Sequence, residues 1–207
     1  MTPTQHDPRI QQLLMPMLQR SVQQALHALS LAQLHLKVQG APEAALWALR
    51  LAPDMLCLAH QVQVLADGVR GALAHLRGDL DDPCAGWVFN RGESDLPPPL
   101  LTGTALTGLL HQARIAIEQQ PDVERIAWHT RRHGPVRVER PGLAREFGTD
   151  DFLWGLVLTN VSFHSTMIHA LLRHGGVPLG KADYVGQSPW ASSAQDSARD
   201  STRDSAC

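Results

Sequence analysis

One stretch constrains the fold of this chain more than any other: residues 149–174, TDDFLWGLVLTNVSFHSTMIHALLRH, which end at two glycines and a proline. Apolar residues recur in it at steps of three and four, the spacing of one buried stripe on an α-helix. Polar residues interrupt it too often for a membrane span, so it predicts a long core helix. The stripe runs through Leu153, Val157, Asn160, His164, Met167 and Leu171. Asn160 and His164 therefore occupy positions where a helical bundle usually buries hydrocarbon.

Three earlier segments show the same period and predict three more long helices: residues 9–38, about 54–77 and 104–120. Pro53 and Asp54 fit the first turn of the second helix, because proline is tolerated there and a carboxylate complements the partial positive charge of a helix N-terminus. Gly68 and Gly71, inside this helix, indicate close approach of a neighbouring helix.

A Gly- and Pro-rich segment, residues 78–103, separates the second and third predicted helices. It predicts a long loop, and loops of this length inside compact domains are uncommon. Trp87 and Phe89 are its aromatic residues, and we expect them to fix it to the surface of the bundle.

Between the third and fourth helices the apolar period changes from about 3.6 to two. Residues 126–130 and 136–140 alternate on either side of His133-Gly134-Pro135, which predicts a short hairpin. After the last helix, residues 177–186 predict an ordered arm, and residues 187–207, rich in Ser, Ala, Asp and Arg, predict a disordered tail. We therefore expect an all-α fold in one domain, residues 1–186: an up-down four-helix bundle with a small β-hairpin between the third and fourth helices.

The composition excludes several classes of protein. Apolar residues make up 43% and charged residues 18% of the chain, a globular balance, and the net charge of −2 gives no general attraction to nucleic acid or anionic membranes. Three cysteines without paired spacing indicate a reducing compartment. The N-terminus lacks the pattern of a signal peptide. We expect a cytoplasmic protein that binds neither nucleic acid nor membrane.

The two long polar side chains of the last helix predict a pocket. Asn160 and His164 are four residues apart, so both project from one face of the helix. Asp54 and Gln61 are seven residues apart, so on the second predicted helix they lie nearly in line beside its buried stripe. We therefore predict that Asp54, Gln61, Asn160 and His164 share a polar pocket. A buried polar group without a partner costs roughly 1–3 kcal/mol, so these groups should be hydrogen-bonded.

Three interpretations of this pocket stay open: a structural hydrogen-bond network, a small-molecule site, and a divalent metal site. His164 is the best single candidate for a metal ligand. His60 is a weak one, because it lies two positions from Val62, the centre of the buried stripe, and thus about 200° around the helix axis, which points it outward. No phosphate loop, Cys-x-x-Cys pair, HExxH motif or nucleophile elbow occurs, so the catalytic residues of any enzyme are unassigned.

Two strings of the sequence resemble signatures of an uncharacterised bacterial branch, a domain of unknown function, within the DinB/YfiT-like superfamily. The first is LAPDM at residues 51–55 followed by HQVQ at 60–63, and the second begins at Asn160-x-x-Phe163-His164 and continues to Gly186. The resemblance covers about residues 8–186 and implies a four-helix up-down bundle, often a homodimer. Many members hold a divalent metal by three histidines, one from the second helix and a His-x-x-x-His pair from the fourth. Some use thiol cofactors in transferase or isomerase reactions.

The chain departs from that metal pattern. Asn160-x-x-x-His164 stands where the His-x-x-x-His pair would fall, and asparagine is a poor zinc ligand, which suggests a degenerate metal site. Our first hypothesis is a non-catalytic or small-molecule-binding cytoplasmic protein with a polar pocket. The alternative is a divalent-metal, thiol-cofactor-dependent transferase or isomerase, and a third hypothesis is an interaction module that acts through dimerisation.

Overall fold

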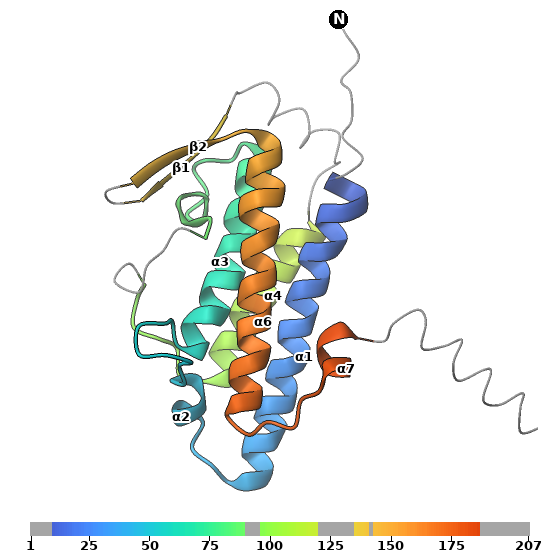
Figure 1. Cartoon of the computed structure of the whole chain (residues 1–207), viewed down its shortest axis with the longest axis vertical. Helices are drawn as coiled ribbons and strands as arrows, with labels where there is room; N and C mark the ends of the chain where they lie inside the picture. Colours follow the sequence, from blue (N-terminus) through green and yellow to red (C-terminus); the bar gives the residue numbers. More distant parts are fainter. Residues whose placement is uncertain (1–9, 90–95, 120–134, 141–142, 187–207) are drawn as a thin grey trace, which may run out of the picture.

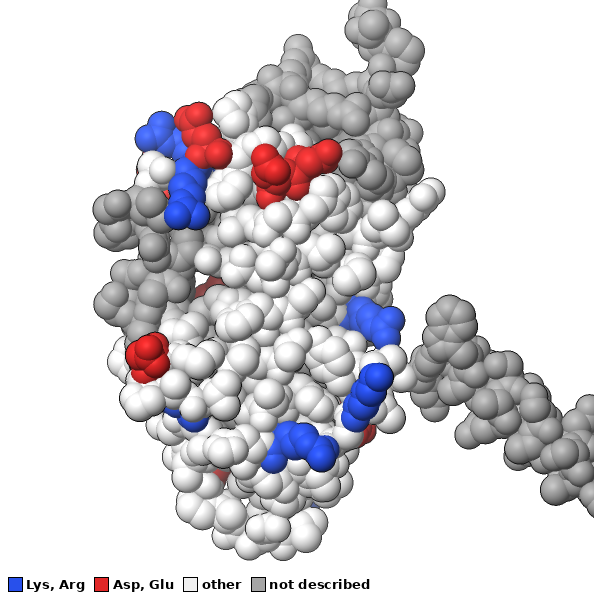
Figure 2. All heavy atoms as spheres, viewed as in Figure 1, with Lys and Arg blue, Asp and Glu red and all other residues white. Residues whose placement is uncertain are grey.

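A computed structural model of the chain describes residues 10–89, 96–119, 135–140 and 143–186. Four long helices form a bundle (Figure 1; all atoms from the same side in Figure 2): α1 (Met15–Gln39), α3 (Leu58–Arg77), α4 (Gly103–Glu118) and α6 (Thr159–His174). Both α1 and α3 pack against α4 and against α6, so α1 and α3 lie across the bundle from each other. The predicted helical bundle with a small hairpin is confirmed. No helix in the described ranges is long and apolar enough to cross a membrane.

The connection between α3 and α4, described as residues 79–89 and 96–102, sets the directions of the helices. It contacts α3 in reverse order: Ala85 lies near His75, and Pro97 lies near His60. The connection therefore returns along α3, and α4 starts at the same end of the bundle as α3 (Figure 1). This makes α3 and α4 parallel, which differs from strict up-down alternation. A 20-residue helix is about 30 Å long, and a connection of this length spans it, whereas a tight turn cannot.

The core lies between the four helices, each of which buries its apolar stripe there. Its fully covered side chains include Leu18, Val22 and Leu29 of α1, Leu65, Val69 and Leu73 of α3, Leu106 and Leu110 of α4, and Ile168 and Leu172 of α6. The short helix α2 (Glu43–Trp47) adds Trp47, which is also fully buried. Its indole N–H donates to the Glu43 carboxylate at 2.9 Å, so the polar end of this large side chain is satisfied.

The predicted start of the second long helix is wrong. Helix α3 begins at Leu58, and Cys57 before it has an extended backbone (φ −68°, ψ 164°). Two contacts hold the preceding residues out of the helix: the Arg50 guanidinium donates to the carbonyl of Met55 at 2.6 Å, and the Leu58 N–H donates to the carbonyl of Leu49 at 2.8 Å. Pro53 and Asp54 therefore lie in a turn, and tertiary contacts override the local helix signal.

The described hairpin uses a different partner strand from the predicted one. Strand β1 (Val136–Arg140) pairs antiparallel with β2 (Leu143–Phe147), with Val136 opposite Phe147 and Arg140 opposite Leu143. The predicted strand 126–130 and its turn at His133-Gly134 lie outside the described residues. The Pro141-Gly142 dipeptide between β1 and β2 is the sequence signal that the prediction passed over.

The last long helix begins with a π-helical stretch, η4 (Asp151–Leu158), that continues into α6, and a shorter one, η1 (Ile10–Leu14), precedes α1. A π-helix bonds i to i+5 and so rotates the following face away from α-helical spacing. Accordingly Val161 is fully buried, and Asn160 is only half-buried. The arm after α6 is ordered as predicted and contains α7 (Lys181–Val185), whereas the predicted tail, residues 187–207, lies outside the described part.

Candidate functional site

His164 and Gln61 meet between α6 and α3, although they are 103 residues apart in sequence. The Nδ1 atom of His164 lies 2.7 Å from Oε1 of Gln61, and the two residues are 6% and 1% exposed. The Gln61 Nε2 donates to the carbonyl of Leu56 at 3.4 Å. Because a carbonyl can only accept, this bond orients the amide with its oxygen toward the imidazole. His164 must therefore carry its proton on Nδ1 and donate it to Gln61.

The imidazole of His164 is neutral at neutral pH. Burial lowers its pKa to about 4, because the charged form loses water and gains no compensating anion. With the proton on Nδ1, the Nε2 atom carries an unshared lone pair. No side chain or backbone group within the described ranges donates a hydrogen bond to it. The site thus presents one oriented hydrogen-bond acceptor.

Two phenylalanines flank this imidazole. The Phe89 ring stacks on it, with ring centroids 5.9 Å apart and planes 12° apart. The Phe163 ring meets it edge-on, at 5.2 Å and 83°. Phe89 comes from the connection between α3 and α4 and has a left-handed backbone, with φ of 52°, while Phe163 is 49% exposed on α6. Both contacts have geometries typical of aromatic pairs.

Asn160 and Asp54 do not join Gln61 and His164 in the predicted pocket. Asn160 donates to the carbonyl of Leu156 in its own helix at 2.8 Å, since η4 turns it away from the core stripe. Asp54 is exposed, because α3 starts four residues after it and so cannot align it with Gln61. The π-helix and the late helix start are tertiary outcomes that the apolar period alone did not indicate.

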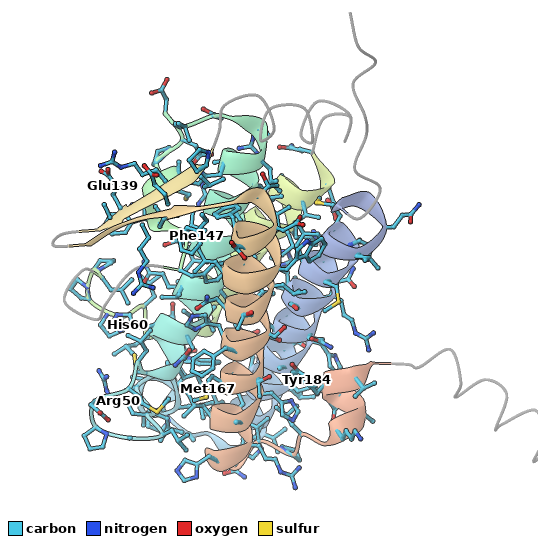
Figure 3. The ribbon with its side chains drawn as sticks, turned by 45° about the horizontal axis from the view of Figure 1, so that its top comes forward. Arg50, His60, Glu139, Phe147, Met167 and Tyr184 are labelled. Carbon is cyan, nitrogen blue, oxygen red and sulfur yellow. The ribbon has the colours of Figure 1, made fainter. Side chains whose placement is uncertain are left out.

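His60 is buried, with 3% of its surface exposed, so the outward orientation predicted for it does not expose it to solvent. It does point away from the bundle axis, but the α3–α4 connection covers that side, and its Nε2 lies 3.0 Å from the carbonyl oxygen of Pro97. Figure 3 shows His60 and Tyr184 on opposite flanks of α6. Gln63 and Asp67, on the same outer side of α3, are also buried, at 8% and 9% exposure.

The residues described do not fit the three-histidine metal site of the superfamily. Nowhere in the described part of the chain do three His, Cys, Asp or Glu side chains gather closely enough to hold a metal ion. The Asn160 amide bonds its own helix, and the Nδ1 of His164 bonds Gln61. One imidazole nitrogen is too few ligands for zinc, which takes three or four from the protein.

A separate surface cavity of about 330 Å³ lies where α1 meets α2, lined by Gln33, Leu36, Lys37, Gly40, Ala41 and Glu43. It includes none of the predicted pocket residues. Its carboxylate is already used: Glu43 accepts the N–H of Gly103 at 2.8 Å and the indole of Trp47. The Gly103 bond, followed by that of Trp47, lowers the pKa of Glu43. Glu43 thus joins α2 to the start of α4.

Sequence reasoning missed the role of Phe89 and Gly68 beside His164. A Cβ atom added at Gly68 would lie 2.3 Å from the Phe89 ring, so glycine is required for the ring to reach α3. The prediction assigned Gly68 and Gly71 to close approach of a helix, but the α3–α4 connection is what approaches, with the carbonyl oxygen of Cys84 2.3 Å from the Cβ position of Gly71. Two glycines three residues apart in a buried helix were the available signal.

Comparisons with known proteins agree with this fold. The chain is similar to the crystal structure of a DinB family member protein from Shewanella denitrificans, with 21% identity and a TM-score of 0.69 over 88% of this chain and 94% of that one. No curated protein matches the chain. The profile of one family, described as Domain of unknown function (DUF1993), matches residues 10–185. The chain therefore belongs to the DUF1993 family, with the helical-bundle fold of DinB-like proteins.

Proposed function

We propose that this protein binds a small molecule that donates a hydrogen bond to Nε2 of His164, and that it performs no acid–base chemistry there. One observation carries the proposal: Gln61 holds the buried imidazole in a single tautomer, with its acceptor nitrogen unshared. The ring of His164 is buried, and among the described residues Nε2 is left as its free acceptor, so a ligand with a donor can bind there without displacing a protein hydrogen bond. Binding sites typically combine apolar walls with a few oriented polar groups, as Phe163 and His164 do here.

The low pKa of His164 argues for recognition rather than catalysis. A general base works best when its pKa lies near the working pH, whereas burial lowers that of His164 to about 4. At neutral pH such an imidazole accepts a hydrogen bond but holds a transferred proton poorly. The metal-dependent transferase alternative gains no support, because the described residues include no group of three His, Cys, Asp or Glu side chains that could hold a metal ion.

Two measurements on the purified full-length chain test the proposal. Nitrogen-15 NMR of the histidine side chains should show Nδ1 of His164 protonated and Nε2 unprotonated at pH 7. Gln61→Leu should remove this preference while keeping the volume of the side chain. Titration with the donor probe benzyl alcohol should then shift Nε2 in the wild type and not in Gln61→Leu.

Measurement of the metal content of the purified protein can contradict the proposal. Stoichiometric zinc, nickel or iron in the wild type, lost in His164→Ala, would overturn the proposal in favour of the metal-dependent alternative. His111→Ala, which removes an exposed imidazole on α4, is the matched control for the loss of one histidine.

A further inference from the structure

We infer that the ligand of the His164 site is a planar aromatic or heteroaromatic ring that bears a short side chain ending in an O–H or N–H donor, and that Phe89 occupies the position of this ring as a plug. The inference rests on the proposed function and names the class of ligand for it. It rests on the space between Gly68 and His164 that the Phe89 ring fills, which we call the ring slot.

The ring slot has the shape of a flat group. On one side is Gly68, where even a methyl group would lie 2.3–2.6 Å from three atoms of the Phe89 ring. On the other is the His164 imidazole, whose plane is within 12° of the Phe89 plane. An aliphatic group is thicker than an aromatic ring, so two such surfaces select for planarity. The slot lies within α3 and α6, which are rigid elements of the bundle.

Phe89 is positioned as a removable occupant of the ring slot. Its φ of 52° is a conformation that bulky residues rarely adopt, and its side chain is only half-buried. The residue before it, Val88, is fully buried, and Cys84 contacts Gly71. The connection thus stays attached to α3 through these neighbours when the Phe89 ring rotates out.

The geometry also indicates where the donor of the ligand must be. The 5.9 Å between centroids means that the stacked rings are offset rather than superposed. The lone pair of Nε2 lies in the imidazole plane, so a donor within the plane of the stacked ring cannot point at it. A donor on one carbon outside the ring plane can, as in benzyl alcohol.

The test compares Phe89→Ala with the wild-type full-length chain by calorimetry and by the Nε2 shift of His164. The probe is benzyl alcohol, with cyclohexylmethanol as the non-planar donor and toluene as the ring without a donor. If the plug is open in about 1–10% of wild-type molecules, its removal tightens benzyl alcohol binding about 10- to 100-fold. Cyclohexylmethanol and toluene should each bind at least about tenfold more weakly than benzyl alcohol.

Matched variants distinguish the effect of emptying the ring slot from the effect of losing any aromatic ring beside His164. Phe163→Ala removes the other ring that touches His164 and should not tighten the binding of benzyl alcohol, because Phe163 does not occupy the ring slot. In the double variant Gly68→Ala with Phe89→Ala, the new methyl group fills the slot, and binding of benzyl alcohol should be lost. Circular dichroism and amide NMR establish that each variant is folded, and Phe89→Leu, which keeps bulk but not planarity, replaces Phe89→Ala if the latter is not.

The outcomes distinguish the inference from the proposed function. Equal affinities for benzyl alcohol and cyclohexylmethanol, both shifting Nε2, would overturn the planar ring and leave the donor site standing. Equal affinities for benzyl alcohol and toluene, neither shifting Nε2, would leave a ring site and overturn the proposed function. A folded Phe89 variant that binds none of the three probes contradicts both.

Discussion

At the scale of single residues, the neighbour of His164 decides its chemistry. An imidazole can donate, accept or carry charge, and which it does depends on what each nitrogen faces. Here Leu56 orients Gln61, and Gln61 orients His164, so two successive hydrogen bonds leave Nε2 as the acceptor. Replacing Gln61 is therefore expected to change the tautomer of a residue in another helix.

The low pKa of His164 predicts a pH-dependent stability. Its folded value of about 4 lies below its ordinary value of 6.5, so between these values the unfolded chain binds a proton that the folded chain does not. The free energy of unfolding should therefore fall as the pH drops from about 6.5 to about 4, by up to about 3 kcal/mol from this residue. In His164→Gln that contribution should be absent. Urea denaturation at several pH values measures the difference.

Two other histidines contribute in the same direction. Burial is the main cause that lowers the pKa of His75 and of His169. Both residues are present in the wild type and in His164→Gln, so the difference between the two pH profiles isolates His164. Parallel profiles between pH 4 and 6.5 would show that His164 keeps access to water.

At the scale of elements, α3 is unusual because every residue from Leu58 to Val69 is buried. Its inner side faces the core, and its outer side faces the α3–α4 connection (Figure 1). The outer side nevertheless has the polar residues of a solvent-facing helix, including His60, Gln63 and Asp67. A sequence pattern of this kind predicts an amphipathic surface helix and does not indicate that the α3–α4 connection covers its polar side.

The contact between α3 and the connection makes Gly71 sensitive to substitution. A Cβ atom there would lie 2.3 Å from the backbone oxygen of Cys84, and a backbone atom cannot rotate away. Gly71→Ala should therefore lower the free energy of unfolding by about 1–3 kcal/mol, although alanine is the better helix former.

Gly108→Ala is the matched control, since Gly108 lies inside α4 with no described atom within 4 Å of its Cβ position. It should raise the free energy of unfolding by up to about 1 kcal/mol. Chemical denaturation of both variants measures these effects. Equal effects at the two glycines would mean that the connection does not lie against α3 as described.

At the scale of the whole molecule, the arm after α6 packs against α1 and α6. Val177 and Leu179 are buried, and α7 lies along α1, where Arg20 and Gln24 donate to the carbonyls of Val185 and Tyr184. The Tyr184 hydroxyl also bonds that of Thr166 on α6, at 2.9 Å. The DUF1993 match ends at residue 185, where α7 ends. The homodimer and the cytoplasmic location stay predictions, and light scattering of the purified chain measures the first.

These contacts predict where the chain can be shortened. Removal of residues 187–207 should change the melting temperature by less than about 2 °C, because the last helix of the described fold ends before them. Removal of residues 177–207 should lower it by at least about 4 °C, because buried Val177 and Leu179 are lost with α7. Calorimetry of the two shortened chains against the full chain measures both effects. Similar losses for both would place a stabilising segment after residue 186.

The sequence by itself determined the four helices, the ordered arm and the inward position of His164, because apolar period, glycine stops and chain length act over a few neighbouring residues. Tertiary structure decided the rest. Contacts of Arg50 and Leu49 make α3 begin at Leu58, which leaves Asp54 exposed. The π-helix rotates Asn160 out of the buried stripe. The α3–α4 connection covers His60 and places Phe89 against His164. Gln61 and His164 are separated by 103 residues, and local sequence patterns do not indicate which residues so far apart come into contact.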